Sequence, residues 1–248
     1  MNKNQAQLSQ LRNWVNSLPK AELHLHLEGA IPISALLELI EKYGGHPSIN
    51  SKEDLIAKLT YKTFPDFIEA WIWKNGFLRT YRDFTFIAES IARDLLRQNI
   101  LYAEIFFSPS RFSDLGLTTE GLAKAIRSGF NKVSGVEIWL IADVVRDHGP
   151  DRAENTIKEV AKAKNYGIVG IGMGGSEHLY PPKPFATAYA EAREMGFKTS
   201  AHAGEASGPD SVWGAVLELQ VDRIGHATRA HEDTSLLDYL QDHSIPIE

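Results

Sequence analysis

Residues 20–29 read KAELHLHLEG, and the two histidines of this stretch, His24 and His26, decide how the rest of the chain is interpreted. In an extended strand, side chains alternate between two faces with a period of two, so both imidazoles lie on one face. Two imidazoles side by side on one strand form half of a site for a divalent metal ion. This stretch alone leaves open an alternative, a pair of hydrogen-bonded polar residues at a strand end.

The composition of the chain excludes several other kinds of site. Its 248 residues are enough for one large domain or two small ones, and its 43% hydrophobic and 23% charged residues are ordinary for a globular protein. The formal net charge of -6 gives no electrostatic reason to expect binding to nucleic acid or to an anionic membrane. The chain has no cysteine, so a metal ion would have to be bound by histidine and carboxylate side chains.

No segment suggests secretion or membrane insertion. Residues 1–20 are polar and lack the apolar core of a signal peptide. No stretch approaches the ~18 consecutive apolar residues of a membrane span. We therefore expect a cytoplasmic protein without membrane association.

Short apolar runs alternate with helical patterns along most of the chain, which predicts βαβ units and a parallel sheet. The resulting fold class is α/β, a (β/α)8-type TIM barrel that is incomplete and contains strands one to about seven. The expected strands are 21–27, 102–108, 137–145, 169–174, 198–203 and 223–226, and 245–248 is the start of a seventh. The expected helices between them are 118–132, 151–165, 184–195, 209–219 and 232–242.

The chain between the first two strands, about 32–100, is expected to form a helical insertion within a single barrel domain over 1–248. Its helices are predicted at 34–43, 52–59, 65–76 and 81–99. Four aromatic residues of this insertion could line an apolar lid, although plain packing of helices on the barrel explains them equally well: Phe64, Phe67, Trp71 and Trp73.

The residues that could carry chemistry fall at the C-terminal ends of predicted strands, the face on which TIM barrels build their active sites. His202 is the natural third ligand for the His24/His26 pair, and zinc lowers the pKa of a bound water to ~7. Glu205 follows after a short Ala-Gly turn and could carry protons between water and substrate. His226 could stabilise the charge that develops. The alternatives are a buried hydrogen-bonded pair for His202 and Glu205, a packed strand histidine for His226, and a tight turn for 174–175.

Four motifs at these strand ends resemble the adenosine deaminase family of metal-dependent hydrolases. They are PKAELHLHLEG at 19–29, GGSE at 174–177, HAGE at 202–205 and RIGH at 223–226. The resemblance implies that His24, His26 and His202 bind one zinc ion per chain. It further implies that Glu205 protonates the purine ring and that His226 positions the attacking hydroxide.

The resemblance also implies where a substrate would lie. Glu28 falls where the family has an acid near the ribose, and the Gly175 backbone matches a glycine that contacts the purine. His26, Glu28 and Gly175 are therefore the expected substrate-binding residues. The expected partner is a small-molecule purine nucleoside, with no nucleic acid and no membrane, and the oligomeric state is not predicted.

The chain departs from the family pattern in two places. The family carries an aspartate pair after its eighth strand, and no residue matches this pair because the chain stops at 245–248. We therefore expect a fragment or a truncated gene product that lacks the C-terminal part of the barrel and is a poor catalyst. In addition, GGSE replaces the more frequent Gly-Asp-Glu ending, and Ala227 replaces a usual glycine.

The function predicted from this resemblance is zinc-dependent hydrolytic deamination of the adenine ring of an adenosine-like nucleoside, with release of ammonia. Adenine, aminodeoxyfutalosine and methylated adenine nucleotides are alternative substrates. A binuclear amidohydrolase is less favoured, because 169–177 contains no lysine that could bridge two metal ions. An inactive fragment or ligand-binding relic is the alternative outside catalysis.

Overall fold

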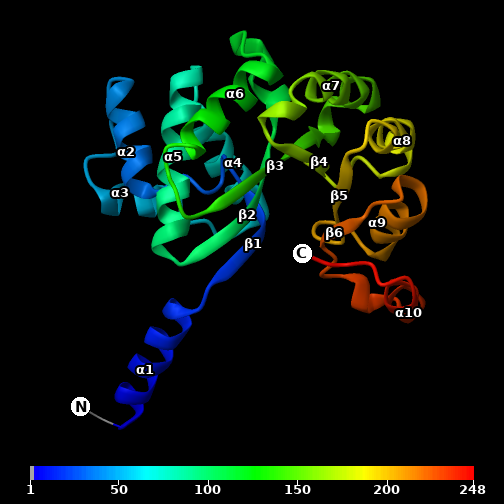
Figure 1. Cartoon of the computed structure of the whole chain (residues 1–248), viewed down its shortest axis with the longest axis horizontal. Helices are drawn as coiled ribbons and strands as arrows, with labels where there is room; N and C mark the ends of the chain where they lie inside the picture. The colour runs from blue at the N-terminus through cyan, green and yellow to red at the C-terminus, as the bar shows by residue number, and fades with distance from the viewer. Residues whose placement is uncertain (1–2) are drawn as a thin grey trace. The chain divides into compact units, whose positions relative to one another are not determined.

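The computed structural model describes residues 3–248, apart from the side chains at 3, 4, 6, 64 and 65. Helices alternate with six β-strands in the order β1-β2-β3-β4-β5-β6 (Figure 1). This is the predicted α/β architecture of the incomplete TIM-barrel type, and the strand bounds agree with the prediction to within two residues. The strands are β1 Lys20–His26, β2 Ile100–Phe107, β3 Glu137–Val145, β4 Ile168–Gly174, β5 Lys198–Ala203 and β6 Arg223–His226.

The described chain divides into two compact units, one made of 1–104 with 126–138 and the other of 105–125 with 139–248. The expectation of a single domain over 1–248 stays a prediction. Among the described residues, none of the helices is both long and apolar enough to cross a membrane.

The first unit contains the predicted helical insertion. Its helices are α2 Ile33–Lys42, α3 Lys52–Lys58, α4 Phe64–Asn75 and α5 Tyr81–Arg97. Asp83 joins two of them, because its buried carboxylate accepts hydrogen bonds from Lys42, from the Tyr43 hydroxyl at 2.6 Å and from the Thr80 N–H at 2.7 Å. One acidic side chain thus caps the start of α5 and holds the end of α2 against it.

The proposed aromatic lid lies in this insertion. Trp73 makes edge contacts with the rings of His46 and Phe77, at centroid distances of 5.4 and 5.3 Å. Phe67 lies beside Tyr61 at 5.1 Å. These contacts are packing within the insertion, and the lid itself stays a prediction; the side chain of Phe64 lies outside the described residues.

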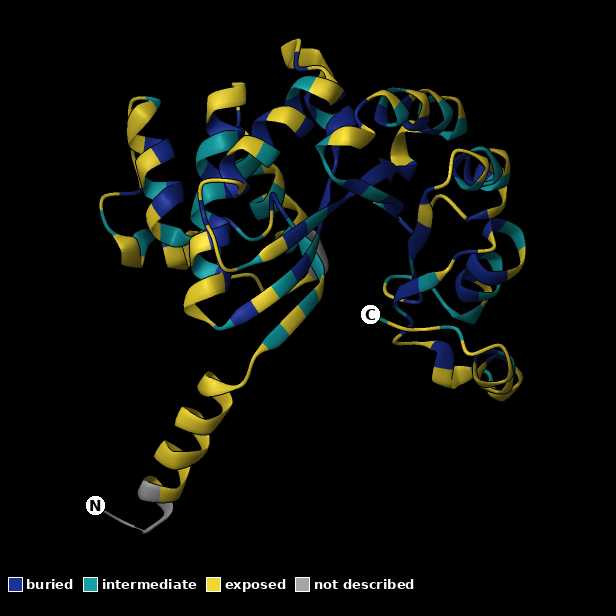
Figure 2. Ribbon diagram, in the orientation of Figure 1, coloured by how far each residue is buried: buried dark blue, intermediate teal, exposed yellow. Residues whose placement is uncertain are grey.

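The N-terminal helix α1, Lys3–Ser17, was not predicted from the sequence. Figure 2 shows its residues 7–17 exposed, and Leu8, Leu11 and Trp14 are each more than half exposed. It therefore contributes nothing to the buried core around the strands.

The second unit contains the parallel pairs β3–β4, β4–β5 and β5–β6. The register sets His202 opposite Gly225 and Ala203 opposite His226. The helices that follow the strands match the predicted ranges, although two of these begin or end in irregular turns: 3-10 at Lys183–Phe185 and π at Ala215–Leu219. They are α6 Thr119–Phe130, which spans both units, α7 Pro150–Lys162, α8 Ala186–Glu194, α9 Pro209–Gly214 and α10 Thr234–Asp242.

The seventh predicted strand forms only one bridge. The Ile224 N–H donates to the Pro246 carbonyl at 3.0 Å, and the Glu248 N–H donates to the Ile224 carbonyl at 2.9 Å. Ile224 and Ile247 form an isolated parallel bridge. The Glu248 carboxylate accepts from Ser200 Oγ at 2.7 Å, so 245–248 lies along β6 in the predicted place.

Candidate metal and catalytic site

The end of β1 presents its two histidines as neighbours. The rings of His24 and His26 have centroids 5.3 Å apart and planes inclined at 70°, and both side chains are half-buried. The period of two in a regular strand explains this arrangement, as the sequence predicted. Imidazole nitrogen atoms in such a pair are ligands that suit zinc.

Glu28, just after β1, is completely buried, and Lys74 of α4 lies close to it. Lys74 Nζ donates a hydrogen bond to the Gly29 carbonyl at 3.1 Å. Burial lowers the pKa of Lys74 to about 8, although the charge of Glu28 acts in the opposite direction. Sequence reasoning missed Lys74, because nothing in α4 marks one lysine as a neighbour of β1.

The ends of β5 and β6 bring together His202, Glu205 and His226. His226 Nε2 lies 3.1 Å from His202 Nδ1 and 3.4 Å from Glu205 Oε2, and Glu205 Oε2 lies 3.5 Å from His202 Nδ1. The two imidazole rings have centroids 4.8 Å apart. A hydrogen bond between the two facing ring nitrogens requires that one of them carries a proton and the other accepts. The Glu205 carboxylate can accept a hydrogen bond from either ring.

These three side chains also form a group that could hold a metal ion. Their donor atoms all lie within 4.8 Å of one another, and imidazole and carboxylate are both ligands of zinc. The end of β1 and the ends of β5 and β6 therefore each offer donors of the kind that zinc requires.

The backbone at the end of β6 adopts a strained conformation. His226 has φ of 72° and the following Ala227 has φ of 48°, both in the left-handed region that favours glycine. Such residues carry a cost of about 1–2 kcal/mol each and occur most often at functional sites. The two left-handed residues turn the chain sharply after His226, at the position where the resemblance leads us to expect a glycine.

Gly175, at the end of β4, occupies a position that only glycine fits. Its φ is 108°, and a Cβ there would overlap Asp147 Oδ2. Asp147 accepts hydrogen bonds from the Ser176 N–H at 2.8 Å and from Ser176 Oγ at 2.6 Å. Burial raises the pKa of Asp147, but the hydrogen bonds from Ser176 outweigh it and hold the pKa below its usual range. Contact between Gly175 and a purine stays a prediction.

Two further residues of this region received no role from the sequence. Glu177 is only 4% exposed, and its carboxylate accepts hydrogen bonds from backbone N–H groups just after His202. Arg146, at the end of β3, is completely buried and donates to the His202 carbonyl at 2.6 Å. In the sequence, Arg146 could have been noticed because an arginine directly follows a long apolar strand. Glu177 could have been noticed as the last residue of the GGSE motif.

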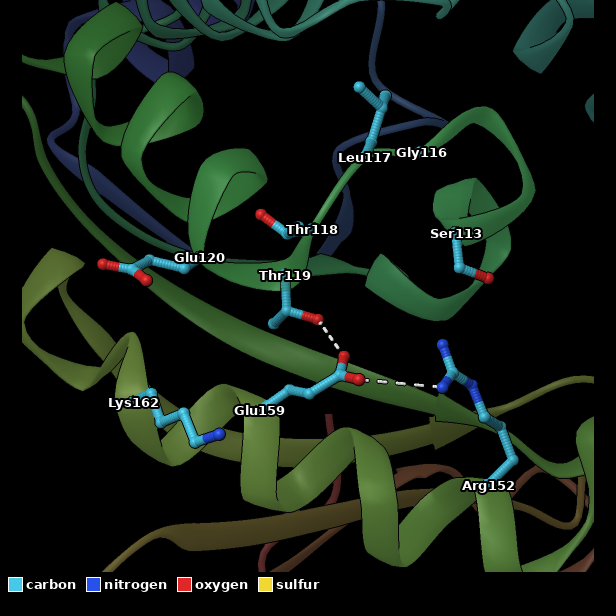
Figure 3. Close-up of a pocket in the computed structure, with 9 residues that line it drawn as sticks. All are labelled: Ser113, Gly116, Leu117, Thr118, Thr119, Glu120, Arg152, Glu159 and Lys162. Atoms are coloured by element: carbon cyan, nitrogen blue, oxygen red, sulfur yellow. Dashed lines mark hydrogen bonds and ion pairs between the residues drawn. The ribbon is translucent and has the colours of Figure 1, made fainter.

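A cavity of about 450 Å³ lies away from these residues, beside the start of α6 and along α7 (Figure 3). Thr119 Oγ1 donates to Glu159 Oε2 at 2.6 Å, and Arg152 lies 3.7 Å from the same carboxylate. Three of its polar side chains, Thr119, Arg152 and Glu159, pair with one another, and none of the predicted site residues lines it.

Comparison with known proteins gives a consistent result. The family model "Adenosine deaminase" matches residues 19–248. An adenine deaminase of Pseudomonas syringae pv. tomato is 34% identical over 95% of this chain and 75% of its own length. The crystal structure of adenine deaminase from Arthrobacter aurescens superposes with a TM-score of 0.83 at 30% identity, over 92% of this chain and 71% of that one.

A second solved structure bears on the metal. An amidohydrolase from Burkholderia ambifaria, solved with bound zinc, superposes with a TM-score of 0.85 at 26% identity, over 95% of this chain and 66% of that one. Together with the four motifs at the strand ends, these matches show that the chain belongs to the adenosine deaminase family of metal-dependent hydrolases.

Proposed function

We propose that the protein is a zinc-dependent hydrolase that removes the amino group of an adenine ring as ammonia. The observation that carries the proposal is the group at the ends of β5 and β6, in which His202, Glu205 and His226 place polar atoms within 3.5 Å of one another. This group can accept, hold and deliver a proton at one point, as hydrolytic deamination requires.

We assign the metal to three histidines, His24 and His26 of β1 and His202 of β5. Family membership supports this set, and so do the positions of the three residues at the C-terminal ends of strands. A zinc ion held by these imidazoles would lower the pKa of a water molecule to about 7 and so supply the nucleophile.

The remaining residues would move protons. Glu205 donates a proton to the ring nitrogen beside the amino-bearing carbon, while a new C–O bond forms at that carbon. His226 holds the attacking water in place and takes up one of its two protons, and the other proton returns to Glu205. The C–N bond then breaks, the amino group leaves as ammonia with the proton taken up by His226, and the ring keeps an oxo group.

Free adenine is the substrate that we would test first. Relatives between 31% and 34% identical bear the name adenine deaminase, and so does the 30% identical structure from Arthrobacter aurescens. The nucleoside predicted from the sequence, adenosine, is the second substrate to test, and Glu28 would be the residue near its ribose.

Ammonia release and the change in purine absorbance on deamination test the proposal directly. We expect turnover of adenine or adenosine that is lost on chelation and restored by zinc. Glu205→Gln should lower turnover by about 10²–10⁴-fold, the usual contribution of a general acid. Glu232→Gln, an exposed glutamate paired with Arg229, is the matched control and should keep full activity. Turnover that survives both chelation and Glu205→Gln would refute the proposal.

A further inference from the structure

We propose that Glu177 and Arg146 are positioning residues, which together hold the backbone that carries His202 and Glu205. The proposal rests on the function proposed above for these two site residues. We call the held segment, residues 202–207, the β5 turn. It is fixed through its N–H groups by Glu177 at the end of β4 and through one carbonyl by Arg146 at the end of β3.

Glu177 binds four consecutive amides of the β5 turn. Its carboxylate accepts hydrogen bonds from the N–H groups of Gly204 at 2.5 Å, Glu205 at 3.1 Å, Ala206 at 2.6 Å and Ser207 at 3.1 Å. Successive N–H groups that converge in this way form an anion-binding nest, and charge-assisted hydrogen bonds are about twice as strong as neutral ones. Here the protein fills the nest with a buried carboxylate of its own.

The conformation of the β5 turn depends on a glycine. Gly204 has φ of 74°, and a Cβ there would lie 2.8 Å from Val212 Cγ2. This left-handed residue allows the following amides to point toward one carboxylate instead of continuing the ladder of β5. Without this acceptor, four amide donors in a partly buried place would lack their common partner, and the turn would lose its defined shape.

Arg146 holds the other side of the same turn. Its Nη2 donates to the His202 carbonyl at 2.6 Å and its Nη1 to the Tyr180 carbonyl at 2.9 Å, and the side chain is completely buried. The carboxylates of Glu177 and Asp147 lie close enough to act on its charge. The guanidinium therefore fixes the peptide carbonyl of His202, while the carboxylate of Glu177 fixes the N–H groups two to five residues further on.

Glu177 and Arg146 act on the reacting groups only through the backbone. Neither Glu177 nor Arg146 takes part in the contacts among His202, Glu205 and His226, but both set the direction in which two of these side chains leave the chain. Residues that orient ligands from behind usually change metal affinity or activity by about 10–100-fold when they are replaced. We therefore expect the loss of either residue to change the orientation of His202 and Glu205 more than the affinity for the substrate.

Glu177→Gln is the sharpest test, because it keeps the shape of the side chain, removes the charge and sets an NH₂ group against amide donors. We expect amide hydrogen exchange at 204–207 to accelerate at least ~10-fold in the zinc-free protein, and zinc affinity measured against a chelator to fall about 10-fold. In the active enzyme kcat should fall about 10–100-fold with little change in KM. Glu218→Gln, a half-buried glutamate paired with Lys183 in the same unit, is the control and should change none of these.

Hydrogen exchange and zinc affinity do not need turnover, so they separate this proposal from the proposed function. A wild-type protein without deaminase activity would refute the function but leave the exchange test valid. Unchanged exchange at 204–207 together with unchanged zinc affinity in Glu177→Gln would refute the positioning role. If Glu177→Gln does not fold, Glu177→Asp decides by the same measurements, since it keeps the charge but draws it back by one methylene. We expect faster exchange in that variant, and unchanged exchange would again refute the proposal.

Discussion

The end of β1 and the ends of β5 and β6 present the same kind of side chain in opposite ways. His24 and His26 lie on a regular strand, and their common orientation follows from the period of two alone. His202 and His226 lie where the backbone turns sharply, with φ of 74° at Gly204 and 72° at His226. A regular strand thus orients its ligands by itself, whereas an irregular strand end needs other residues to hold it.

His24→Ala tests whether the β1 histidines bind the metal while Glu205 moves protons. We expect zinc affinity to fall about a thousandfold, since the ~10–16 kcal/mol of a zinc site is shared among its ligands. Glu205→Gln should leave zinc affinity nearly unchanged although it lowers turnover by about 10²–10⁴-fold. Competition with a chelating dye measures both, and His243→Ala, an exposed histidine directly after α10, is the control. If Glu205→Gln loses zinc and His24→Ala does not, the ion lies in the β5–β6 group.

Asp83→Asn tests how the unit that contains β1 is stabilised. The buried carboxylate of Asp83 binds Lys42, Tyr43 and Thr80, and we expect its replacement to lower the free energy of unfolding by about 3 kcal/mol. Denaturant unfolding measures the change. Asp94→Asn, which breaks a surface pair with Arg97 on the same helix, should change the free energy by less than about 1 kcal/mol. Equal effects of the two variants would contradict a structural role for the Asp83 network.

The pH dependence of this effect has a defined sign. Burial raises the pKa of Asp83, but hydrogen bonds from Lys42, Tyr43 and Thr80 outweigh it and lower the pKa below its unfolded value. The stabilisation is therefore fully present above the unfolded pKa of about 3.9 and is lost as the pH falls through the folded pKa. Asp83→Asn should remove this part of the acid sensitivity.

The regular parts of the fold could be predicted from the sequence, because apolar periodicity records which face of an element is buried. The insertion helices α2 to α5 and the pair His24/His26 are examples. Helix α1 could not be found in this way, because its apolar residues Leu8 and Leu11 face no core.

The hydrogen bonds that support the site could not be predicted either. Glu177 was visible within a motif, but no local pattern shows that its carboxylate meets amides 27 to 30 residues further along the chain. The same holds for Arg146, whose carbonyl partner on His202 is 56 residues away. Such contacts depend on which strand ends become neighbours, and this is a property of the assembled sheet.

Lys74→Met tests whether the lysine beside Glu28, just after β1, is held in a buried environment that lowers its pKa. Burial lowers the folded pKa of Lys74 to about 8, below its unfolded value, so the unfolded chain binds more protons between about pH 8 and 10.5. Across this window the free energy of unfolding of the wild type should rise relative to the variant, by about 1 kcal/mol after solvent screening. Denaturant unfolding at several pH values measures the difference, with Lys58→Met, at an exposed lysine of α3, as the control. Parallel pH profiles would show that Lys74 is not held in a buried environment.

Ala227→Gly tests the strain at the β6 end, where regular strand geometry breaks down. Ala227 has φ of 48°, a conformation that costs alanine about 1–2 kcal/mol and glycine almost nothing. Part of that gain is offset by the greater freedom of glycine in the unfolded chain, so we expect a net stabilisation of about 0.5–1 kcal/mol. Ala203→Gly, at the end of β5 and outside the left-handed region, should instead destabilise the protein. Thermal unfolding of both variants compares them. Changes of opposite sign in the unfolding temperature would show that the backbone at the end of β6 is strained. Equal destabilisation by the two variants would show that the turn after His226 carries no strain.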